Sequence, residues 1–174
     1  MDSQQYTIRE AQPAEFKAIG QLMVSVYARL EGFPKPQEQP AYYEKLANIG
    51  NMVEKPKVRL LVAVSNEGKI GGAVVYLGDM AFYGSGGIAT QQKDAAGFRL
   101  LTVEPNTRGL GLGKHLSLAC IDLAREEGNR QMIIHTTNAM KPAWKMYEKI
   151  GFSRSEDLDF FMEDFPVLGF RLAL

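Results

Sequence analysis

The chain has 174 residues, of which 45% are hydrophobic, and its 20 Lys and Arg balance its 20 Asp and Glu. This length fits one domain whose core needs no disulfide or metal, and the lack of a basic excess argues against non-specific nucleic-acid binding. The single cysteine, Cys120, excludes an internal disulfide and leaves no cysteine partner for zinc. No apolar run reaches the roughly 20 residues that span a bilayer, and the polar start shows no secretory pattern. We therefore expect a cytoplasmic domain over 1–174, with neither a membrane nor nucleic acid as partner.

The first half of the chain predicts two helices and then a β-hairpin. Apolar residues at helical spacing follow Pro13 and stop at Gly32, and a proline-rich loop over 32–40 precedes the second helix. A turn over 65–68 joins the two strands. The predicted elements are helices over 13–30 and about 41–53 and strands over 58–64 and 69–77. The next stretch, 78–97, shows no period, and a loop of this length is usually functional or mobile.

The second half alternates strands and helices. Pro105 ends the first of these strands, and Gly128 stands where a helix C-terminal glycine belongs. The predicted elements are strands over 98–103 and 131–136, helices over about 111–127 and 141–150, a strand that begins at 151–152 and a final strand over 167–174. Helices, a hairpin and then alternating strands and helices indicate a mixed α/β sheet in one domain.

The segment 108–114 is a glycine-rich turn between a predicted strand and a long helix. Its three glycines let the backbone turn tightly and bring amide groups close to a ligand, and Arg108 and Lys114 add positive charge. With the helix dipole, these groups form a site for a phosphate or pyrophosphate. The spacing between Gly109 and Gly113 is one residue shorter than a Walker A loop requires. The glycine pattern also differs from the Rossmann motif G-x-G-x-x-G. A glycine-rich connection without a ligand is the alternative.

Two motifs in this half resemble those of a known family. Arg108, Gly111 and Gly113 form Arg-x-x-Gly-x-Gly directly after a Leu-x-Val-x-Pro strand end. Further on, 143–152 reads Ala-x-x-x-Tyr-Glu-Lys-x-Gly-Phe. Both resemble motifs of the GNAT superfamily of acyl-CoA-dependent N-acetyltransferases, in the expected order and with one helix and one strand between them. The resemblance extends over about 58–152.

The resemblance implies a single α/β (α+β) domain with a mixed, mostly antiparallel sheet flanked by helices. Its central strands, 98–103 and 131–136, are expected to splay apart and admit the pantetheine arm of acetyl-CoA, without a metal. Backbone groups near Leu101 and Val103 would bind the pantetheine, and the amides of 108–113 the pyrophosphate. The residues expected to contact acetyl-CoA are Leu101, Val103, Arg108, Gly109, Leu110, Gly111, Leu112, Gly113, Lys114 and Asn138.

The resemblance also carries the family's general acid onto Tyr147, which would protonate the leaving thiolate. The alternative for Tyr147 is a packed aromatic, because it belongs to an apolar helical stripe. The family often places a glutamate base where this chain has Gly97. Glu104, beside the cofactor loop, is the remaining candidate base, unless it is simply solvated. His135 titrates in a useful range, but the interpretation favoured over a base is a structural histidine with satisfied hydrogen bonds.

His115 is expected to be exposed or near a phosphate, and Cys120 to be a core residue. Candidates for the acceptor site are Tyr27, Glu31, Phe33 and the 78–97 segment. Five acids between Gly151 and Phe165 could attract a cationic amine or form a solvated face.

The sequence therefore predicts an N-acetyltransferase that moves an acetyl group from acetyl-CoA to a primary amine of a small molecule or peptide, directly in a ternary complex. Acetyl transfer needs a neutral amine, a positioned carbonyl, donors for the developing oxyanion and a proton for the thiolate. A non-catalytic acyl-CoA-binding regulatory domain is the alternative, since Gly97 replaces the common glutamate. A nucleotide-binding module is a further alternative for the function. The sequence leaves open whether the protein forms a homodimer.

Overall fold

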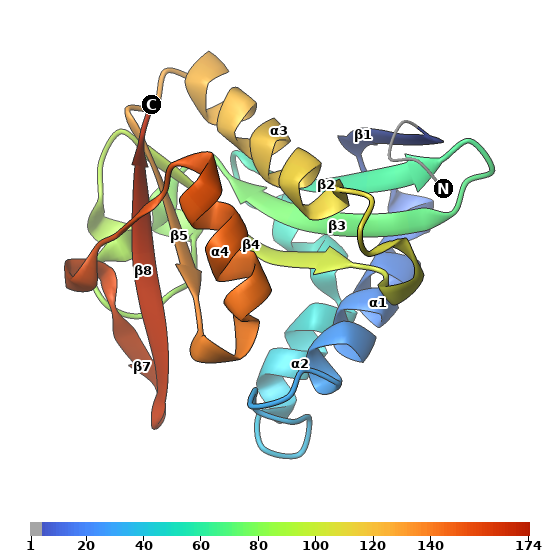
Figure 1. The fold of residues 1–174 in the computed structure, drawn as a ribbon, viewed down its shortest axis with the longest axis horizontal. Helices are drawn as coiled ribbons and strands as arrows, with labels where there is room; N and C mark the ends of the chain where they lie inside the picture. Colours follow the sequence, from blue (N-terminus) through green and yellow to red (C-terminus); the bar gives the residue numbers. More distant parts are fainter. Residues whose placement is uncertain (1–4) are drawn as a thin grey trace.

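The computed structural model describes residues 5–174, so positions 1–4 of the predicted domain lie outside the described residues. Figure 1 shows a twisted sheet with helices on both of its faces. The α-helices are α1 (Phe16–Ala28), α2 (Pro40–Ala47), α3 (Leu112–Glu126) and α4 (Lys141–Ile150). The strands are β1 (Tyr6–Glu10), β2 (Val58–Ser65), β3 (Ile70–Leu77), β4 (Ala95–Val103), β5 (Gln131–Thr136), β6 (Ser153–Arg154), β7 (Phe160–Met162) and β8 (Phe165–Ala173).

The strands form one eight-stranded sheet in the order β1-β2-β3-β4-β5-β8-β6, with β7 paired to β8. Every neighbouring pair is antiparallel except β4 and β5. These two are parallel because α3 carries the chain back across the sheet between them, as a parallel pair requires. The predicted mixed, mostly antiparallel sheet is thereby confirmed.

The central strands β4 and β5 separate along their length. They pair only through 95–97 and 131–133, although β4 continues to Val103 and β5 to Thr136. In the same region β4 carries a bulge, since two of its residues, Leu100 and Leu101, lie opposite the single residue Val74 of β3. Leu100 has a φ of +60°, which a branched side chain rarely adopts. Because a bulge bends its strand and leaves one residue unpaired, it helps to turn β4 away from β5.

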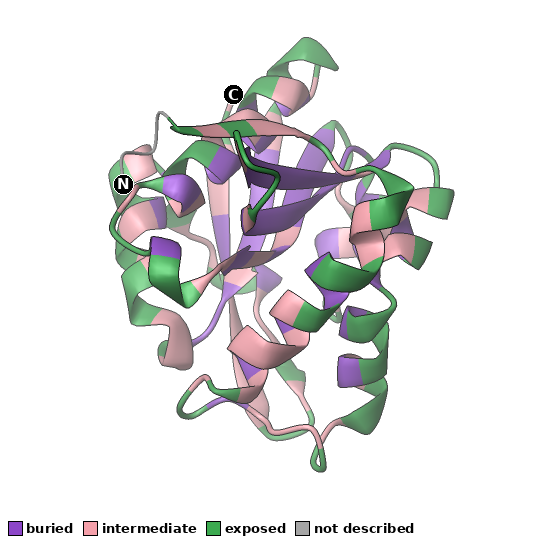
Figure 2. Ribbon diagram, turned by 90° about the vertical axis from the view of Figure 1, so that its right-hand side faces the viewer, coloured by how far each residue is buried: buried purple, intermediate pink, exposed green. Residues whose placement is uncertain are grey.

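The sheet separates two core layers. Helices α1 and α2 cover one face, and α3 and α4 cover the other (Figure 1). Side chains of β4 alternate between these layers up to the bulge. Phe98 packs on α4, where its ring centroid lies 5.8 Å from that of Tyr147, whereas Arg99 lies on the α1–α2 side. The bulge interrupts the alternation, so the next residue, Leu100, belongs to the same side as Arg99. Figure 2 shows that buried residues concentrate in the central strands, so burial on both faces is the main stabilising contribution.

The beginning of the chain differs from the predicted elements. Strand β1 is absent from the predicted elements because it is short and largely polar, although its apolar residues Tyr6 and Ile8 alternate with polar ones and pack on the α3–α4 layer. It forms by backbone pairing with the edge of β2, for example Thr7 opposite Val64. The helix expected over 41–53 is divided, since α2 ends at Ala47 and a 3-10 helix follows over Ile49–Glu54. Gly50 lies so close to the Phe16 ring that a β-carbon there would overlap it, and this packing decides the local path.

The segment predicted as an aperiodic loop over 78–97 ends inside the sheet. It contains the 3-10 turns Met80–Phe82 and Ala89–Gln91, and β4 begins already at Ala95. Residues 95–97 supply the whole β4 side of the pairing with β5. The alanine and glycine in this stretch are weak strand formers, so pairing rather than propensity makes them a strand.

Cys120 is completely buried in α3, as predicted. Within residues 5–174, no helix is long and apolar enough to cross a membrane. The same residues contain no group of three or more His, Cys, Asp or Glu side chains that could hold a metal ion.

Candidate active site

A cavity of about 810 Å³ lies where β4 and β5 separate. The turn before α3 and helix α4 line one end of it, and α1, α2 and β7 line the other. A volume of this order is typical of sites that enclose most of a small ligand. Most of the residues predicted to bind the cofactor line it. These are Leu101, Val103, Arg108, Gly109, Gly111, Leu112, Gly113 and Lys114.

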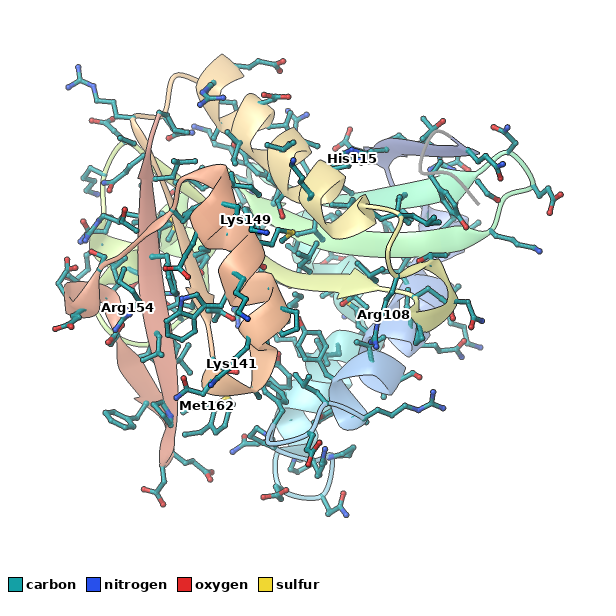
Figure 3. The ribbon with its side chains drawn as sticks, in the orientation of Figure 1. Arg108, His115, Lys141, Lys149, Arg154 and Met162 are labelled. Atoms are coloured by element: carbon teal, nitrogen blue, oxygen red, sulfur yellow. The ribbon has the colours of Figure 1, made fainter. Side chains whose placement is uncertain are left out.

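The turn between β4 and α3 presents backbone amides to one end of the cavity. Gly109 and Gly111 have φ values of +88° and +79°, which glycine adopts without strain. Within the described chain, the amides of both glycines and of 112–114 donate to no protein acceptor. Figure 3 shows Arg108 projecting from this turn, and Lys114 is exposed on the first turn of α3. Free amides at the positive end of a helix dipole, beside two cations, form an anion site.

Two features between this turn and the sheet fit an extended ligand. A β-carbon at Gly113 would lie 3.5 Å from Val103 Cγ2 and 3.8 Å from the Met146 sulfur, which is ordinary contact, so protein packing alone does not require glycine here. The Thr136 hydroxyl is buried and has no hydrogen-bond partner among the described residues, although Thr136 lines the cavity. An unpaired buried hydroxyl costs about 1–3 kcal/mol. A polar ligand atom beside it offsets that cost, which fits the amide-bearing pantetheine arm of acetyl-CoA.

Tyr147 faces the cavity from α4. Its ring is 5% exposed and packs edge-on against Phe98 and Phe152. Its hydroxyl makes no hydrogen bond to any residue that the structure describes. Burial raises the pKa of Tyr147 well above its usual value, with smaller contributions from Tyr83 and Cys120. The hydroxyl is therefore protonated at neutral pH and can donate a proton into the cavity.

Tyr27 connects the two core layers at the bulge. Its hydroxyl donates to the Leu101 carbonyl at 3.1 Å, and its ring lies 5.5 Å from that of Phe33. Tyr27 and Phe33 line the cavity, as predicted for acceptor-site residues, whereas Glu31 does not. The Leu101 carbonyl, in the stretch expected to bind pantetheine, is thus already engaged by Tyr27.

Tyr83 and His135 form a hydrogen-bonded pair at the acceptor end. Nδ1 of His135 lies 2.9 Å from the Tyr83 hydroxyl, and Nε2 lies 2.8 Å from the Leu158 carbonyl. Because a carbonyl only accepts, Nε2 carries the proton, and Nδ1 of the neutral ring accepts from Tyr83. Desolvation, helped by the positive charge of Arg99, lowers the pKa of His135, which keeps the ring neutral at pH 7.

The position of the expected glutamate, Gly97, is filled by another residue. A β-carbon there would lie 2.7 Å from a Tyr83 ring carbon and 2.7 Å from the Ile133 carbonyl oxygen, so no side chain fits. The Tyr83 ring therefore occupies the space into which a side chain at 97 would project. The sequence names the 78–97 segment as an acceptor-site candidate but does not single out Tyr83, because no motif marks it there.

Several predicted residues lie outside the cavity. The Glu104 carboxylate accepts from the Asn106 amide at 2.8 Å and so caps the 3-10 turn Pro105–Thr107. Leu110 and Asn138 do not line the cavity either, and Asn138 is exposed. His115 was predicted to be either exposed or near a phosphate, and it is exposed on α3 (Figure 3).

Two of the five acids after Gly151 are paired with arginines. Asp159 and Arg154 form a two-pronged ion pair at 2.9 Å, and Asp157 binds Arg171 at 2.7 Å. None of the five acids lines the cavity. The run therefore does not attract a cationic amine into this site. The same segment instead contributes apolar side chains that the sequence did not single out, Phe160 and Met162.

A splayed sheet whose strand–helix turn offers a row of free amides, with a buried proton donor inside the splay, is the architecture of an acyl-CoA-dependent acyltransferase. The sequence profile of the Acetyltransferase (GNAT) family matches residues 23–152. The chain belongs to this family and is an acyltransferase. Members of the family transfer acyl groups from acetyl-CoA.

Individual proteins agree with this assignment. The chain is 34% identical over 116 residues, 64% of its own length and 68% of the relative's, to the uncharacterized N-acetyltransferase YjgM of Escherichia coli K12. An acetyltransferase of the GNAT family from Staphylococcus aureus Mu50 has the same fold, with a TM-score of 0.74, 17% identity, and coverage of 97% and 99% of the two chains. The acetyltransferase yncA of Salmonella typhimurium, solved with its cofactor acetyl-CoA, matches with a TM-score of 0.63 and 18% identity over 97% and 94%.

Proposed function

We propose that this protein, acting as one domain over 1–174, transfers the acetyl group of acetyl-CoA to a primary amine of a small molecule or peptide, directly in a ternary complex. The observation that carries the proposal is the continuity of the cavity, which runs from the free amides of Gly109 and 111–114 past Tyr147 to the Tyr83–His135 pair. One chamber can therefore hold both substrates. Cys120, the single cysteine, is fully buried, and burial raises its pKa, which argues against an acyl-cysteine on the route.

The bulge and Tyr147 serve the acyl end of the reaction. The bulge at Leu100 and Leu101 leaves backbone groups of β4 outside the ladder, and a free amide there can stabilise the oxyanion that develops on the carbonyl. Removing one such donor typically costs about 10²–10³ in rate. Tyr147 donates its proton to the sulfur as the carbon–sulfur bond breaks, a contribution of about 10²–10⁴ for a well-placed acid.

Tyr83 and His135 take the proton at the amine end. As the nitrogen bonds to the carbonyl carbon it becomes positively charged, and its N–H becomes acidic. The Tyr83 oxygen accepts that proton while the Tyr83 hydroxyl passes its own to Nδ1 of His135, along the 2.9 Å hydrogen bond. The resulting imidazolium donates to Tyr83 and to the Leu158 carbonyl, so both of its N–H groups are satisfied. In this mechanism Tyr83 replaces the missing glutamate, and Glu104 acts only as a cap.

An amine panel tests the proposal. The protein is incubated with acetyl-CoA and a series of primary amines, and free thiol is measured over time. We expect thiol release that depends on the amine and an intersecting initial-rate pattern, as a ternary complex requires. Parallel lines would contradict direct transfer.

The competing function is a regulatory acyl-CoA-binding domain, which Gly97 would favour. It predicts that CoA raises the thermal midpoint while no amine in the panel releases thiol. The occupied space beside Gly97 weakens this alternative, because Tyr83 supplies a proton acceptor where the glutamate is absent.

A further inference from the structure

The acceptor end of the cavity contains an arginine without an acidic partner. Arg99 lines the cavity and is half-buried. One of its guanidinium nitrogens donates to the Tyr83 carbonyl at 2.8 Å, and its carbon lies 5.6 Å from the Tyr83 ring centroid. None of the ion pairs within residues 5–174 includes Arg99. A guanidinium offers five N–H donors, so most of its hydrogen-bonding capacity is left for a ligand.

A second cation lies beside the first. Arg99 Nη1 and Lys45 Nζ lie 3.0 and 3.5 Å from the point that a β-carbon of Gly84 would occupy. The Lys45 side chain is exposed and does not line the cavity, so it lies outside the space that a ligand would occupy. Desolvation, together with the like charge of Arg99 and then of Lys55, lowers the pKa of Lys45 to about 8. The positive charge around Arg99 favours an anion at its free donors.

The protein's own acids near this point are already engaged. Asp159, the acid that influences His135, is held by Arg154 and by the Gly169 amide. Asp157 is bound to Arg171. Because no described carboxylate pairs with Arg99, an anion at its free donors would come from a ligand.

The rest of this end of the cavity is apolar. Its walls come from α1, the loop after it, α2 and the β7–β8 hairpin, and the side chains are Leu30, Phe33, Tyr42, Phe160, Met162 and Val167. A ligand here meets a hydrophobic surface beside one cationic corner. Such a site suits a molecule with an apolar body and a single negative group.

We propose that Arg99 binds a carboxylate of the acceptor, and that the acceptor is an amino acid with an apolar side chain. This inference rests on the proposed function for the role of the amine, but the carboxylate site itself is a binding property. The guanidinium would hold the carboxylate while the amine reaches Tyr83, whose carbonyl Arg99 already contacts. The carboxylate would fix the orientation of the amine, because both polar groups of the ligand then meet neighbouring residues.

The experiment compares amino acids with amines that lack only the carboxylate. Calorimetric titrations use leucine against 3-methylbutylamine, methionine against 3-(methylthio)propylamine and phenylalanine against 2-phenylethylamine, each with and without saturating CoA. We expect at least one amino acid to bind about tenfold or more tightly than its partner, as loss of a charged hydrogen bond implies. Arg99→Gln should remove this preference and Arg99→Lys should keep part of it, whereas Lys45→Gln, which alters a cation outside the cavity, should leave most of it.

Arg108→Gln is the matched control, because it removes a cation from the other end of the same cavity. It should weaken CoA binding and leave the preference for the amino acid unchanged. Equal binding within every pair, or a preference that survives Arg99→Gln, overturns the carboxylate site.

Thiol release measured on the same pairs separates this inference from the proposed function. Equal release with both members of each pair supports the transferase and overturns the carboxylate site. A carboxylate preference in binding that is lost in Arg99→Gln, with no release from any compound, supports the site and overturns transfer to these amines.

Discussion

The two ends of the cavity present different kinds of polar group. At the end proposed for the cofactor the donors are backbone amides of one short segment, Gly109 and 111–114, and no described residue accepts from them. At the acceptor end the polar groups are side chains, Tyr83, Arg99 and His135, brought together from separate parts of the chain. A backbone site depends on local conformation, whereas a side-chain site depends on how distant segments pack. The first tolerates changes elsewhere in the protein, and the second allows one fold to take many acceptors.

The ends also differ in how their charges are exposed. Arg108 and Lys114 at the cofactor end are exposed, so salt screens their attraction for a polyphosphate. Arg99 is half-buried, and its charge influences Tyr83, His135 and Lys45. We therefore expect Arg108 and Lys114 to attract an anionic cofactor over a longer range. Arg99 would act on a negative group of the acceptor only in direct contact.

The largest effect is expected at the junction of the two ends, from Tyr147→Phe. This change keeps the ring packed against Phe98 and Phe152 but removes the proton donor. We expect kcat to fall by about 10²–10⁴ with little change in acetyl-CoA affinity. Steady-state kinetics with an active amine from the panel measure both values. Turnover near that of the unmodified protein would assign Tyr147 to packing, and water or another group would then supply the proton.

Gly113→Ala separates the backbone site from the stability of the fold. A β-carbon at this position makes only ordinary contacts, and alanine is the better helix former, so the unliganded protein should gain up to about 1 kcal/mol. The same carbon projects between Val103 and Met146, into the space assigned to the cofactor. Saturation with CoA at 100 times its Kd stabilises a protein by about 2.7 kcal/mol, and we expect the variant to lose this shift.

Differential scanning fluorimetry of the variant with and without CoA provides both measurements. Gly111→Asp should also abolish the CoA shift, but its φ of +79° makes that residue strained, so a loss of stability is expected there as well. A full CoA shift in Gly113→Ala would remove the turn from the cofactor site.

The smallest effect is a pH dependence that arises at the acceptor end. The groups facing His135 are Tyr83, Arg99, Asp159 and the Leu158 carbonyl, and desolvation dominates to lower its pKa in the folded state. The unfolded chain therefore binds a proton first as pH falls. The contribution of His135 to stability is complete above about pH 6.5 and is lost below it, by at most about 1.4 kcal/mol per pH unit.

Denaturant unfolding between pH 5 and pH 8 measures this dependence. His135→Gln should flatten the profile below pH 6.5, whereas His115→Gln, which alters an exposed histidine on α3, should not. The decrease of kcat/KM at low pH should likewise change in His135→Gln and not in His115→Gln, because only the neutral His135 ring accepts the proton. A profile that responds to His115 and not to His135 would break the proposed relay.

Much of the fold is predictable because its signals are local. The β2–β3 hairpin, the β4–α3–β5–α4 succession and the final strand follow from periodicity, turns and glycine positions. Strand β1 carries only a short signal, the alternation of Tyr6 and Ile8 with polar residues, and pairing with the edge of β2 makes it a strand. The early start of β4 at Ala95 has the same cause, since its pairing with β5 joins segments that are distant in sequence.

The sequence by itself determined the cofactor half of the site. The glycines of 109–113 set the backbone conformation of consecutive residues, and helical spacing sets Tyr147 in the apolar stripe of α4. The tertiary structure alone decided the acceptor half. Tyr83 and His135 are 52 positions apart, and Tyr83 reaches its place because Gly97 leaves room for the ring. Local motifs encode backbone geometry, but the meeting of side chains from distant segments depends on packing that no single segment contains.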